Sequence, residues 1–269
     1  MASSERLDLA RQTAIVTGSS SGIGAGTARE LASAGADVVI NFHGSEHDAD
    51  ALVVDIEAMG RRSFKIAADV SSETDVIAMF DEAETRLGPI DIVVSNAGVQ
   101  KDAPLAQMSL DDWNAVIGVN LTGAFLVGRE AVRRFREKGV REDVSPALGK
   151  LVFVSSVHQI VPWAFHANYA ASKGGIDMLM RSIAQEVALE KIRVNSVAPG
   201  AIATAINAEE RENNHDAMLK LIPYGRIGEP ADVGRTVAWI VSDAADYLTG
   251  QTIFLDGGMT LYPCFKGNG

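Results

Sequence analysis

Two residues that can take part in proton transfer stand four positions apart in the segment NYAASKGG, Asn168 to Gly175: Tyr169 and Lys173. Residues i and i+4 share one face of a helix, so the phenol and the ammonium would lie side by side. Tyrosine has an ordinary pKa of about 10 and is a poor base at neutral pH. A cation within about 4 to 6 Å favours the phenolate and lowers that pKa. The pair therefore predicts a base that removes the hydroxyl proton of an alcohol while hydride leaves the carbon for a cofactor.

A serine precedes this pair where a buried strand is expected to end. Ser156 closes the run KLVFVSS, thirteen residues before Tyr169. Open parallel sheets bind ligands at their carboxyl edge, so this hydroxyl can hold a substrate oxygen beside the tyrosine. The apolar residues after Tyr169 follow helical spacing, and they are Ile176, Leu179, Met180, Ile183 and Val187. We therefore predict that the Tyr-Lys pair lies at the N-terminal end of a helix packed on the core.

A glycine-rich turn near the N-terminus predicts a dinucleotide site. In TAIVTGSSSGIGAGTARELA, three glycines stand between a first strand and a first helix. Glycines there let the backbone approach a pyrophosphate, which the helix N-terminus then holds. A tight turn without a ligand is the alternative, because one such turn is a weak signal by itself. The residues expected to contact the dinucleotide are Gly18, Ser20, Ser21, Gly22, Ile23 and Gly24.

The end of the second expected strand, DVVINFHGS, bears on the choice between NAD and NADP. An acid at this position binds the adenosine 2'-hydroxyl of NAD, whereas a nearby cation accommodates the 2'-phosphate of NADP. Phe42 stands where the acid is expected, His43 follows it, and Ser21 supplies no cation. We therefore predict use of both coenzymes, with a preference for NADP. Asp69 and Val70, after the third strand, are candidate adenine contacts, although Asp69 fits equally well as an N-terminal acid of the next helix.

These sites need a scaffold, and the order of elements supplies one. Apolar, β-branched runs alternate with segments of helical period, and the runs are TAIVTG, DVVINF, SFKIAADV, IDIVVSNAG, KLVFVSS, IRVNSVAPG and QTIFLDGG. Strands that are apolar on both faces, joined by helices, indicate a parallel sheet with right-handed crossovers. We therefore predict an α/β fold in which residues 1–269 form a single doubly wound, Rossmann-type domain with a sheet of about seven strands.

The composition is that of an acidic globular protein. The 269 residues carry 24 Lys and Arg against 35 Asp and Glu, a net charge of -11, which argues against nucleic acid or an anionic membrane as a partner. The most basic stretch, 129–143, has acids interleaved with its cations and is interpreted as a solvated helix end. The single cysteine, Cys264, has no metal-ligand cluster around it, and neither an apolar leader nor a long apolar run is present. We expect a cytoplasmic protein without a metal site.

Several motifs, in chain order, resemble those of the short-chain dehydrogenase/reductase family across nearly the whole chain, and they are TGSSSGIG, NAG, VNLTG, YAASK and PG. The resemblance implies an NAD(P)-dependent oxidoreductase with the catalytic residues Asn120, Ser156, Tyr169 and Lys173. It also implies that Asn120 sits at a helix irregularity that organises water near the lysine, and that Lys173 holds the nicotinamide ribose. The further cofactor contacts that it implies are Asn96, Ala97, Gly98, Pro199, Gly200, Ile202 and Thr204. Thr204 also fits an ordinary loop hydroxyl.

Four further segments resemble bacterial glucose 1-dehydrogenases within that family: SSVHQIVPW, PGAIATAINAE, IPYGRIGEP and DGGMTLYPCF. The resemblance implies oxidation of β-D-glucose at C1 to glucono-1,5-lactone. A polyol needs several hydrogen-bonding side chains, and the candidates are Gln100, His158 and Asn207, with Trp163 offering a face to sugar C–H groups. Each has an alternative, since His158 could cap its loop, Trp163 could lie in the core or a subunit interface, and Asn207 could begin a helix.

Two other functions remain open. A reductase of acyl-carrier thioesters would be favoured by a strongly basic patch, which the sequence lacks. A dinucleotide-sensing regulator would be indicated by loss of Ser156, Tyr169 or Lys173, and all three are present. The family resemblance implies a homotetramer, and the apolar segment MTLYPCF is expected to pack on a neighbouring subunit. The segment Val140–Gly149 departs from the resemblance as an insertion, so we expect an unusual loop there.

Overall fold

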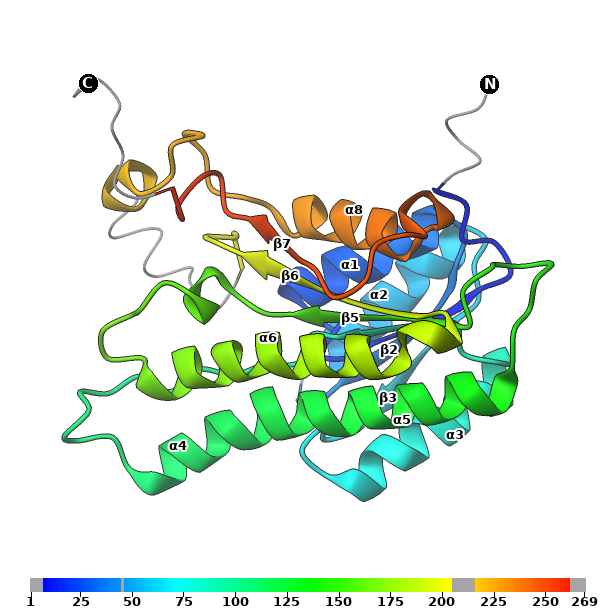
Figure 1. Ribbon diagram of the computed structural model, residues 1–269, viewed down its shortest axis with the longest axis horizontal. Coiled ribbons are helices and arrows are strands. Elements are labelled where there is room, and N and C mark those ends of the chain that lie inside the picture. Colours follow the sequence, from blue (N-terminus) through cyan, green and yellow to red (C-terminus); the bar gives the residue numbers. More distant parts are fainter. Residues whose placement is uncertain (1–6, 45, 205–215, 262–269) are drawn as a thin grey trace.

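In the residues that the structure describes, the apolar runs pair edge to edge as seven strands of one parallel sheet (Figure 1). This computed structural model describes residues 7–44, 46–204 and 216–261. The strands are β1 (Thr13–Val16), β2 (Asp37–Phe42), β3 (Ser63–Ala67), β4 (Ile92–Ser95), β5 (Gly149–Val154), β6 (Ile192–Pro199) and β7 (Thr252–Leu255). Their order in the sheet is β3-β2-β1-β4-β5-β6-β7. The doubly wound α/β fold predicted from the sequence is thereby confirmed.

Helices cover both faces of the sheet. They are α1 (Gly22–Ser33), α2 (Glu46–Ala58), α3 (Glu73–Leu87), α4 (Leu110–Ile117), α5 (Gly123–Lys138), α6 (Ala167–Val187) and α8 (Pro230–Val241). One core lies beneath α1, α2 and α8, and the other beneath α3, α5 and α6 (Figure 1). Ile15 packs into one core and its neighbour Val16 into the other. Burial of both faces explains why the strands are apolar at successive positions.

A single long helix runs from Leu110 to Lys138 through α4, a π-helical turn and α5. Ser109 caps its N-terminus, because its hydroxyl accepts a hydrogen bond from the N–H of Asp112 at 3.0 Å. The helix is long and apolar enough to cross a membrane, but 56% of its most apolar window is buried inside the protein. It packs against α3, α6 and the strands β4 and β5. We therefore interpret it as a core helix of this fold.

The segment Val140–Gly149, expected to form an unusual loop, closes the amino end of the sheet. Arg141 in this loop donates a hydrogen bond to the buried carboxylate of Asp91 at 3.0 Å. Lys138 donates to the same carboxylate at 2.7 Å, and the backbone N–H of Thr13 donates to it at 3.0 Å. A buried carboxylate with several donors is satisfied, so the loop is anchored to the end of the sheet.

A buried lysine lies next to this anchor on β5. The side chain of Lys150 is 2% exposed, and its amine donates to Gln12 Oε1 at 2.8 Å and lies 3.3 Å from the carboxylate of Asp243. Burial lowers the pKa of Lys150 from 10.5 to about 8, against the opposing attraction of Asp243. The folded protein therefore releases this proton at a lower pH than the unfolded chain does.

Between about pH 8 and pH 10.5 the unfolded chain binds a proton that folded Lys150 has lost, so the free energy of unfolding rises with pH there. We expect Lys150→Met to reduce this rise by up to about 3 kcal/mol, the equivalent of the pKa difference. Urea unfolding at a series of pH values measures it. Lys65→Met is the control and should keep the rise, because hydrogen bonds to Asp50 and Glu46 raise the pKa of Lys65. An unaltered slope in Lys150→Met would contradict the assignment.

Candidate active site

Ser156, Tyr169 and Lys173 come together at the carboxyl edge of the sheet, between β5 and α6. Ser156 follows the end of β5, and its hydroxyl accepts a hydrogen bond from the N–H of His158 at 3.2 Å. Since α6 begins at Ala167, Tyr169 and Lys173 lie on one face of its first two turns. The amine of Lys173 lies 5.4 Å from the centre of the Tyr169 ring.

Lys173 extends its amine into the interior of the protein. The residue is 4% exposed, and its Nζ donates to the carbonyl oxygen of Val154, at the end of β5, at 2.9 Å. Burial lowers the pKa of Lys173 to about 8. Because this value is still above 7, the amine carries its charge at neutral pH and can act on the neighbouring phenol.

The pKa of Tyr169 corrects one expectation from the sequence. Burial raises this pKa, and hydrogen bonds with the side chains of Ser156 and Gln100 oppose the rise only in part. Lys173 alone therefore does not bring the phenol below its ordinary pKa. The physical reason is that removing water from the phenolate costs more than Ser156 and Gln100 return, and the charge of Asp102 adds to the rise.

Asn120 lies in the π-helical turn Gly118–Thr122, which is the helix irregularity that the family resemblance implied. The residue is 1% exposed, and its amide exchanges two hydrogen bonds with the backbone of Val99, at 2.8 and 3.1 Å. Its Nδ2 also donates to the hydroxyl of Ser172 at 3.1 Å. Because Ser172 precedes Lys173 in α6, Asn120 joins the long helix, the loop after β4 and the catalytic helix.

The turn between β1 and α1 has the shape that a dinucleotide phosphate requires. Gly22 has a φ of +54°, and a Cβ at Gly24 would collide with the carbonyl oxygen of Gly18. α1 begins at Gly22, and its N-cap, Ser21, makes no capping hydrogen bond with its side chain. The N-terminal amides are therefore suited to binding an anion, so these residues fit a nicotinamide dinucleotide. Ile23, the other predicted contact in this turn, packs partly against the core beneath α1.

Two buried polar residues outside the predicted set hold this turn in place. Asn41, within β2, accepts a hydrogen bond on Oδ1 from the N–H of Gly18 at 3.0 Å. Thr17 accepts hydrogen bonds on Oγ1 from the N–H groups of Asn96 and Ala97 at 2.9 and 3.1 Å. The signal for Asn41 is a polar side chain inside the apolar run DVVINF, which is costly unless hydrogen-bonded.

The predicted cofactor residues Asn96 to Gly98 join β4 to the glycine turn. Asn96 donates from Nδ2 to the carbonyl oxygens of Thr17 and Gly18 at 2.8 and 3.0 Å. A Cβ at Gly98 would lie 3.4 Å from Oδ1 of Asn120. The side chain of Asn96 therefore supports the turn, and this segment links the turn to the catalytic helix.

At the end of β2, one predicted coenzyme contact is buried and the next is exposed. Phe42 is 7% exposed and packs in the core, whereas the next residue, His43, is exposed.

After β3, Asp69 accepts hydrogen bonds on Oδ1 from the N–H and the hydroxyl of Ser71 at 2.8 and 2.7 Å. This favours its alternative role at the start of the α3 segment. These bonds lower the pKa of Asp69, with a smaller contribution from His43. Val70 is 5% exposed, so its side chain is part of the core.

The loop after β6 folds back towards the glycine turn. β6 ends at Pro199, and the N–H of Gly200 donates to the carbonyl of Leu255 at 3.0 Å. Ile202 is 4% exposed and packs in the core, so its backbone is the part suited to contact a cofactor. The methyl group of Thr204 lies 3.3 Å from the position of a Cβ on Gly22. Thr204 also borders a cavity of about 450 Å³ together with Ser20 and Ser21.

Three predicted substrate residues surround Tyr169, and the fourth, Asn207, lies outside the described residues. The side chain of Gln100 lies near the phenol and opposes the rise of its pKa. The rings of His158 and Trp163 stand edge-on to the Tyr169 ring, with centres 6.3 and 6.2 Å away. They also stack on each other at 4.3 Å. This arrangement places polar groups and flat ring faces around one phenol.

His158 can itself bind a hydroxyl group. Burial lowers its pKa, so the neutral ring is favoured. Its Nδ1 faces the carbonyl oxygen of Val161 at 3.0 Å, and a carbonyl oxygen can only accept. Nδ1 therefore carries the proton, which leaves Nε2 as a hydrogen-bond acceptor.

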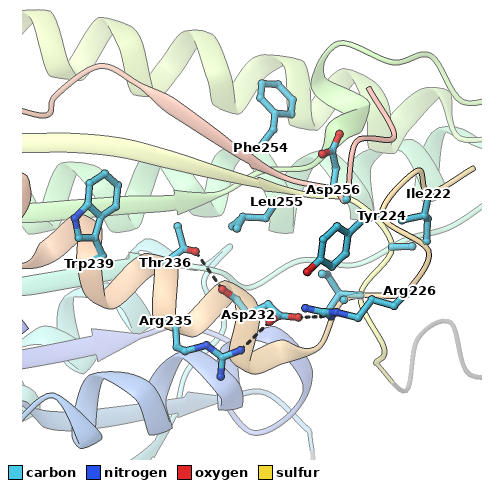
Figure 2. Close-up of a pocket in the computed structure, with 14 residues that line it drawn as sticks. Ile222, Tyr224, Arg226, Asp232, Arg235, Thr236, Trp239, Phe254, Leu255 and Asp256 are labelled. Atoms are coloured by element: carbon cyan, nitrogen blue, oxygen red, sulfur yellow. Dashed lines mark hydrogen bonds and ion pairs between the residues drawn. The ribbon is translucent and has the colours of Figure 1, made fainter. Parts of the chain in front are cut away.

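A hollow of about 580 Å³ lies between α8 and the end of β7 (Figure 2). Its walls include Tyr224, Trp239 and Asp256. At its rim Asp232 accepts hydrogen bonds from Arg226 and Arg235, each at 2.7 Å. None of the four predicted catalytic residues borders this hollow. We therefore assign the substrate site to the region around Tyr169 from the positions of these residues and not from the volume of the hollow.

Comparison with known proteins gives consistent matches over almost the whole chain. A family model described as Enoyl-(Acyl carrier protein) reductase matches residues 18–260. The chain is 44% identical over 261 residues to 3beta-hydroxysteroid dehydrogenase 1 of Eggerthella lenta, covering 96% of this chain and 97% of the relative. It is 40% identical over 258 residues to glucose 1-dehydrogenase 2 of Bacillus subtilis, covering 95% and 97%.

A solved structure agrees with the sequence matches. A gluconate 5-dehydrogenase from Burkholderia cenocepacia J2315, in complex with NADP and tartrate, superposes with a TM-score of 0.88 at 35% identity, covering 96% of this chain and 98% of that chain. The fold, the order of the motifs and the similarity over nearly the full length therefore all indicate the same family. The protein belongs to the short-chain dehydrogenase/reductase family of NAD(P)-binding oxidoreductases.

Proposed function

We propose that this protein oxidises a hydroxyl group on a ring-shaped substrate with NAD or NADP, and that its substrate is β-D-glucose or a similar aldose, oxidised at C1 to the lactone. The observation that carries the proposal is the set of groups around the Tyr169 phenol. The polar side chains of Ser156 and Gln100 lie near the phenol and oppose the rise of its pKa, and the rings of His158 and Trp163 stand beside it. Polar groups suit the hydroxyls of a sugar, and aromatic rings suit its C–H groups.

The side chains of this site account for the proton that leaves the alcohol. Ser156 holds the substrate oxygen, and Tyr169 accepts the hydroxyl proton. Lys173 supplies a positive charge that stabilises the phenolate, and Asn120 positions the helix that carries both residues through Ser172. A bound nicotinamide coenzyme supplies the acceptor for the hydride and, when oxidised, a second positive charge.

The coenzyme would be held by residues at the carboxyl edge from β1 to β6. The glycine turn Gly18–Gly24 suits the pyrophosphate, and Lys173 suits the nicotinamide ribose. The 2' position of the adenosine ribose would meet Phe42 and His43. Neither residue is an acid, so both coenzymes are accepted and NADP is preferred.

A second candidate substrate is a 3β-hydroxysteroid. The rings of His158 and Trp163 beside Tyr169 can contact a fused alicyclic ring, and the similarity to the Eggerthella lenta relative supports this class. The third class, acyl-carrier thioesters, has the description of the family model in its favour. The net charge of -11 counts against docking of an acidic carrier. A sensor without turnover is disfavoured because Ser156, Tyr169 and Lys173 are all present.

A coupled panel of substrates distinguishes these classes. Purified protein is given D-glucose, other aldoses or a 3β-hydroxysteroid with NAD or NADP, and formation of the reduced coenzyme is followed by its absorbance. We expect reduction with glucose. Reduction with the steroid alone would favour the second candidate, whereas oxidation of NADPH by a 3-oxoacyl thioester, with no alcohol oxidised, would favour the third.

Tyr169→Phe should lower kcat by at least about 100-fold, because general-base catalysis contributes about two to four orders of magnitude. Coenzyme affinity, measured by quenching of protein fluorescence, should stay within twofold because the glycine turn is untouched. Tyr247→Phe is the control, since Tyr247 is fully exposed. A near-normal kcat in Tyr169→Phe would contradict the base assignment.

His43→Arg should raise the ratio of kcat/KM for NADP over NAD by about tenfold, the effect of about 1.4 kcal/mol from one charge-assisted hydrogen bond to the 2'-phosphate. His43→Gln is the control, because it removes the imidazole without adding a permanent cation. The same ratio in all three proteins would show that this residue does not meet the 2' position.

We further propose that the whole chain acts as one dehydrogenase domain in a cytoplasmic homotetramer. Exposed apolar side chains on the described surface support an assembly, and they include Phe125, Met178, Leu189, Tyr224 and Trp239. Size-exclusion chromatography with light scattering should give four times the mass of the chain. A monomer at micromolar concentration would contradict the proposal.

A further inference from the structure

Two loops that are distant in the sequence are joined beside Tyr169. One follows β4 and contains Lys101 to Ala103, and the other precedes α6 and contains Trp163 to His166. The N–H of Ala103 donates to the carbonyl of Phe165 at 2.9 Å. Asn168, at the start of α6, donates from Nδ2 to the carbonyl of Lys101 at 2.9 Å. The two loops therefore form one wall of the site.

Three rings of this wall lie face to face. The ring of His166 stacks on the indole of Trp163 with centres 3.5 Å apart and planes inclined by 4°. On the other side of the indole, His158 stacks at 4.3 Å and 16°. Trp163 is thus held between two imidazoles, and its edge points at the ring of Tyr169, 6.2 Å away. Such packing restricts the rotation of the indole.

The outer imidazole is fixed from both of its nitrogens. Nε2 of His166 lies 3.1 Å from a carboxylate oxygen of Asp102, and Nδ1 lies 2.7 Å from the carbonyl oxygen of Ala164. These two contacts, at opposite edges of the imidazole, fix the orientation of the ring against the indole.

The stacking of these rings requires a strained backbone conformation. Phe165, between the stacked pair, has a φ of +71°, in the left-handed region that non-glycine residues rarely adopt. This conformation turns the chain so that His166 returns over Trp163, and the N–H of His166 donates to the carbonyl of Trp163 at 3.3 Å. Phe165 is 61% exposed, so no burial of its side chain accounts for the strain. Strained residues of this kind occur where the surrounding contacts require a particular geometry.

We propose that Asp102 and His166 are positioning residues for substrate: Asp102 holds His166 flat against Trp163, and this fixes the indole, whose edge borders the space beside Tyr169 that the substrate ring enters. The inference rests on the proposed oxidation of a ring hydroxyl. His166 acts through Trp163, whereas the charge of Asp102 also raises the pKa of the Tyr169 phenol. His166 therefore sets how well a ring binds and leaves the proton transfer itself unchanged, so its variants carry the kinetic test.

The test separates binding from chemistry. His166→Ala should raise KM for the best substrate of the panel by about tenfold, while kcat stays within threefold and KM for the coenzyme is unchanged. Asp102→Asn keeps the size of the side chain and removes its charge, so its KM should rise by a smaller factor. His166→Phe restores a flat ring over the indole and should recover part of the loss. His47→Ala is the matched control, because His47 also pairs with an aspartate, Asp48, but is exposed and remote.

A spectroscopic measurement on the protein alone tests whether His166 acts through Trp163. The contribution of Trp163 to the near-ultraviolet circular dichroism is defined by Trp163→Phe. His166→Ala should lose that contribution, since an indole that rotates freely gives little signal. Loss of the signal with an unchanged KM, or a raised KM with the signal intact, would overturn the proposal. An equal loss in kcat and in coenzyme affinity would also overturn it, because it would show a general loosening of the fold.

Failure of the proposed function has a different signature. It would be seen in the wild-type protein as an absence of turnover with sugars and steroids. The circular dichroism needs no substrate, so it would then test the contact between His166 and Trp163 by itself. The two proposals can therefore fail separately.

Discussion

Lys173 brings a charged amine into the interior at the point where β5 ends, and this burial constrains the rest of the site. Its hydrogen bond to the carbonyl of Val154 ties the first turns of α6 to the carboxyl edge of the sheet. Tyr169 is then placed beside Ser156 because it lies one helical turn before the lysine. Asn120 reinforces the same attachment from the long helix through Ser172. A buried amine is tolerable only when its surroundings are fixed, so the chemistry and the rigidity of this region have one origin.

Burial also determines how the two titrating groups depend on a coenzyme. It lowers the pKa of Lys173 to about 8 and raises the pKa of Tyr169, so each group is moved away from its charged form. A phenol in this state is a weak base by itself. An oxidised coenzyme brings the additional positive charge that favours the phenolate, and its departure removes that charge. In the proposed mechanism, Tyr169 therefore serves as the base only when a coenzyme is bound.

The sequence predicts the scaffold well because its signals are local. Runs such as DVVINF and the stripe from Ile176 to Val187 report burial directly, and the four-residue spacing of Tyr169 and Lys173 follows from helix geometry. The pKa of Tyr169 could not be predicted in this way, because desolvation depends on packing from several elements. Asn41 has a local signal, a polar residue in an apolar strand, but its partner in the glycine turn is known only from the fold. The NAD or NADP preference stays a prediction because Phe42 and His43 match neither rule.

The aromatic wall shows why motifs identify the reaction more readily than the substrate. The proposed catalytic side chains stand just after β5, on α6 and in the long helix, whose positions are fixed by the sheet, so the same set can serve many alcohols. The wall instead joins two loops through His166 and Asp102, which are far apart in the sequence and carry no motif. A change in a loop contact of this kind does not disturb the sheet, but the change alters the surface that a substrate ring meets. In the proposed arrangement, specificity therefore depends on residues that no catalytic motif contains.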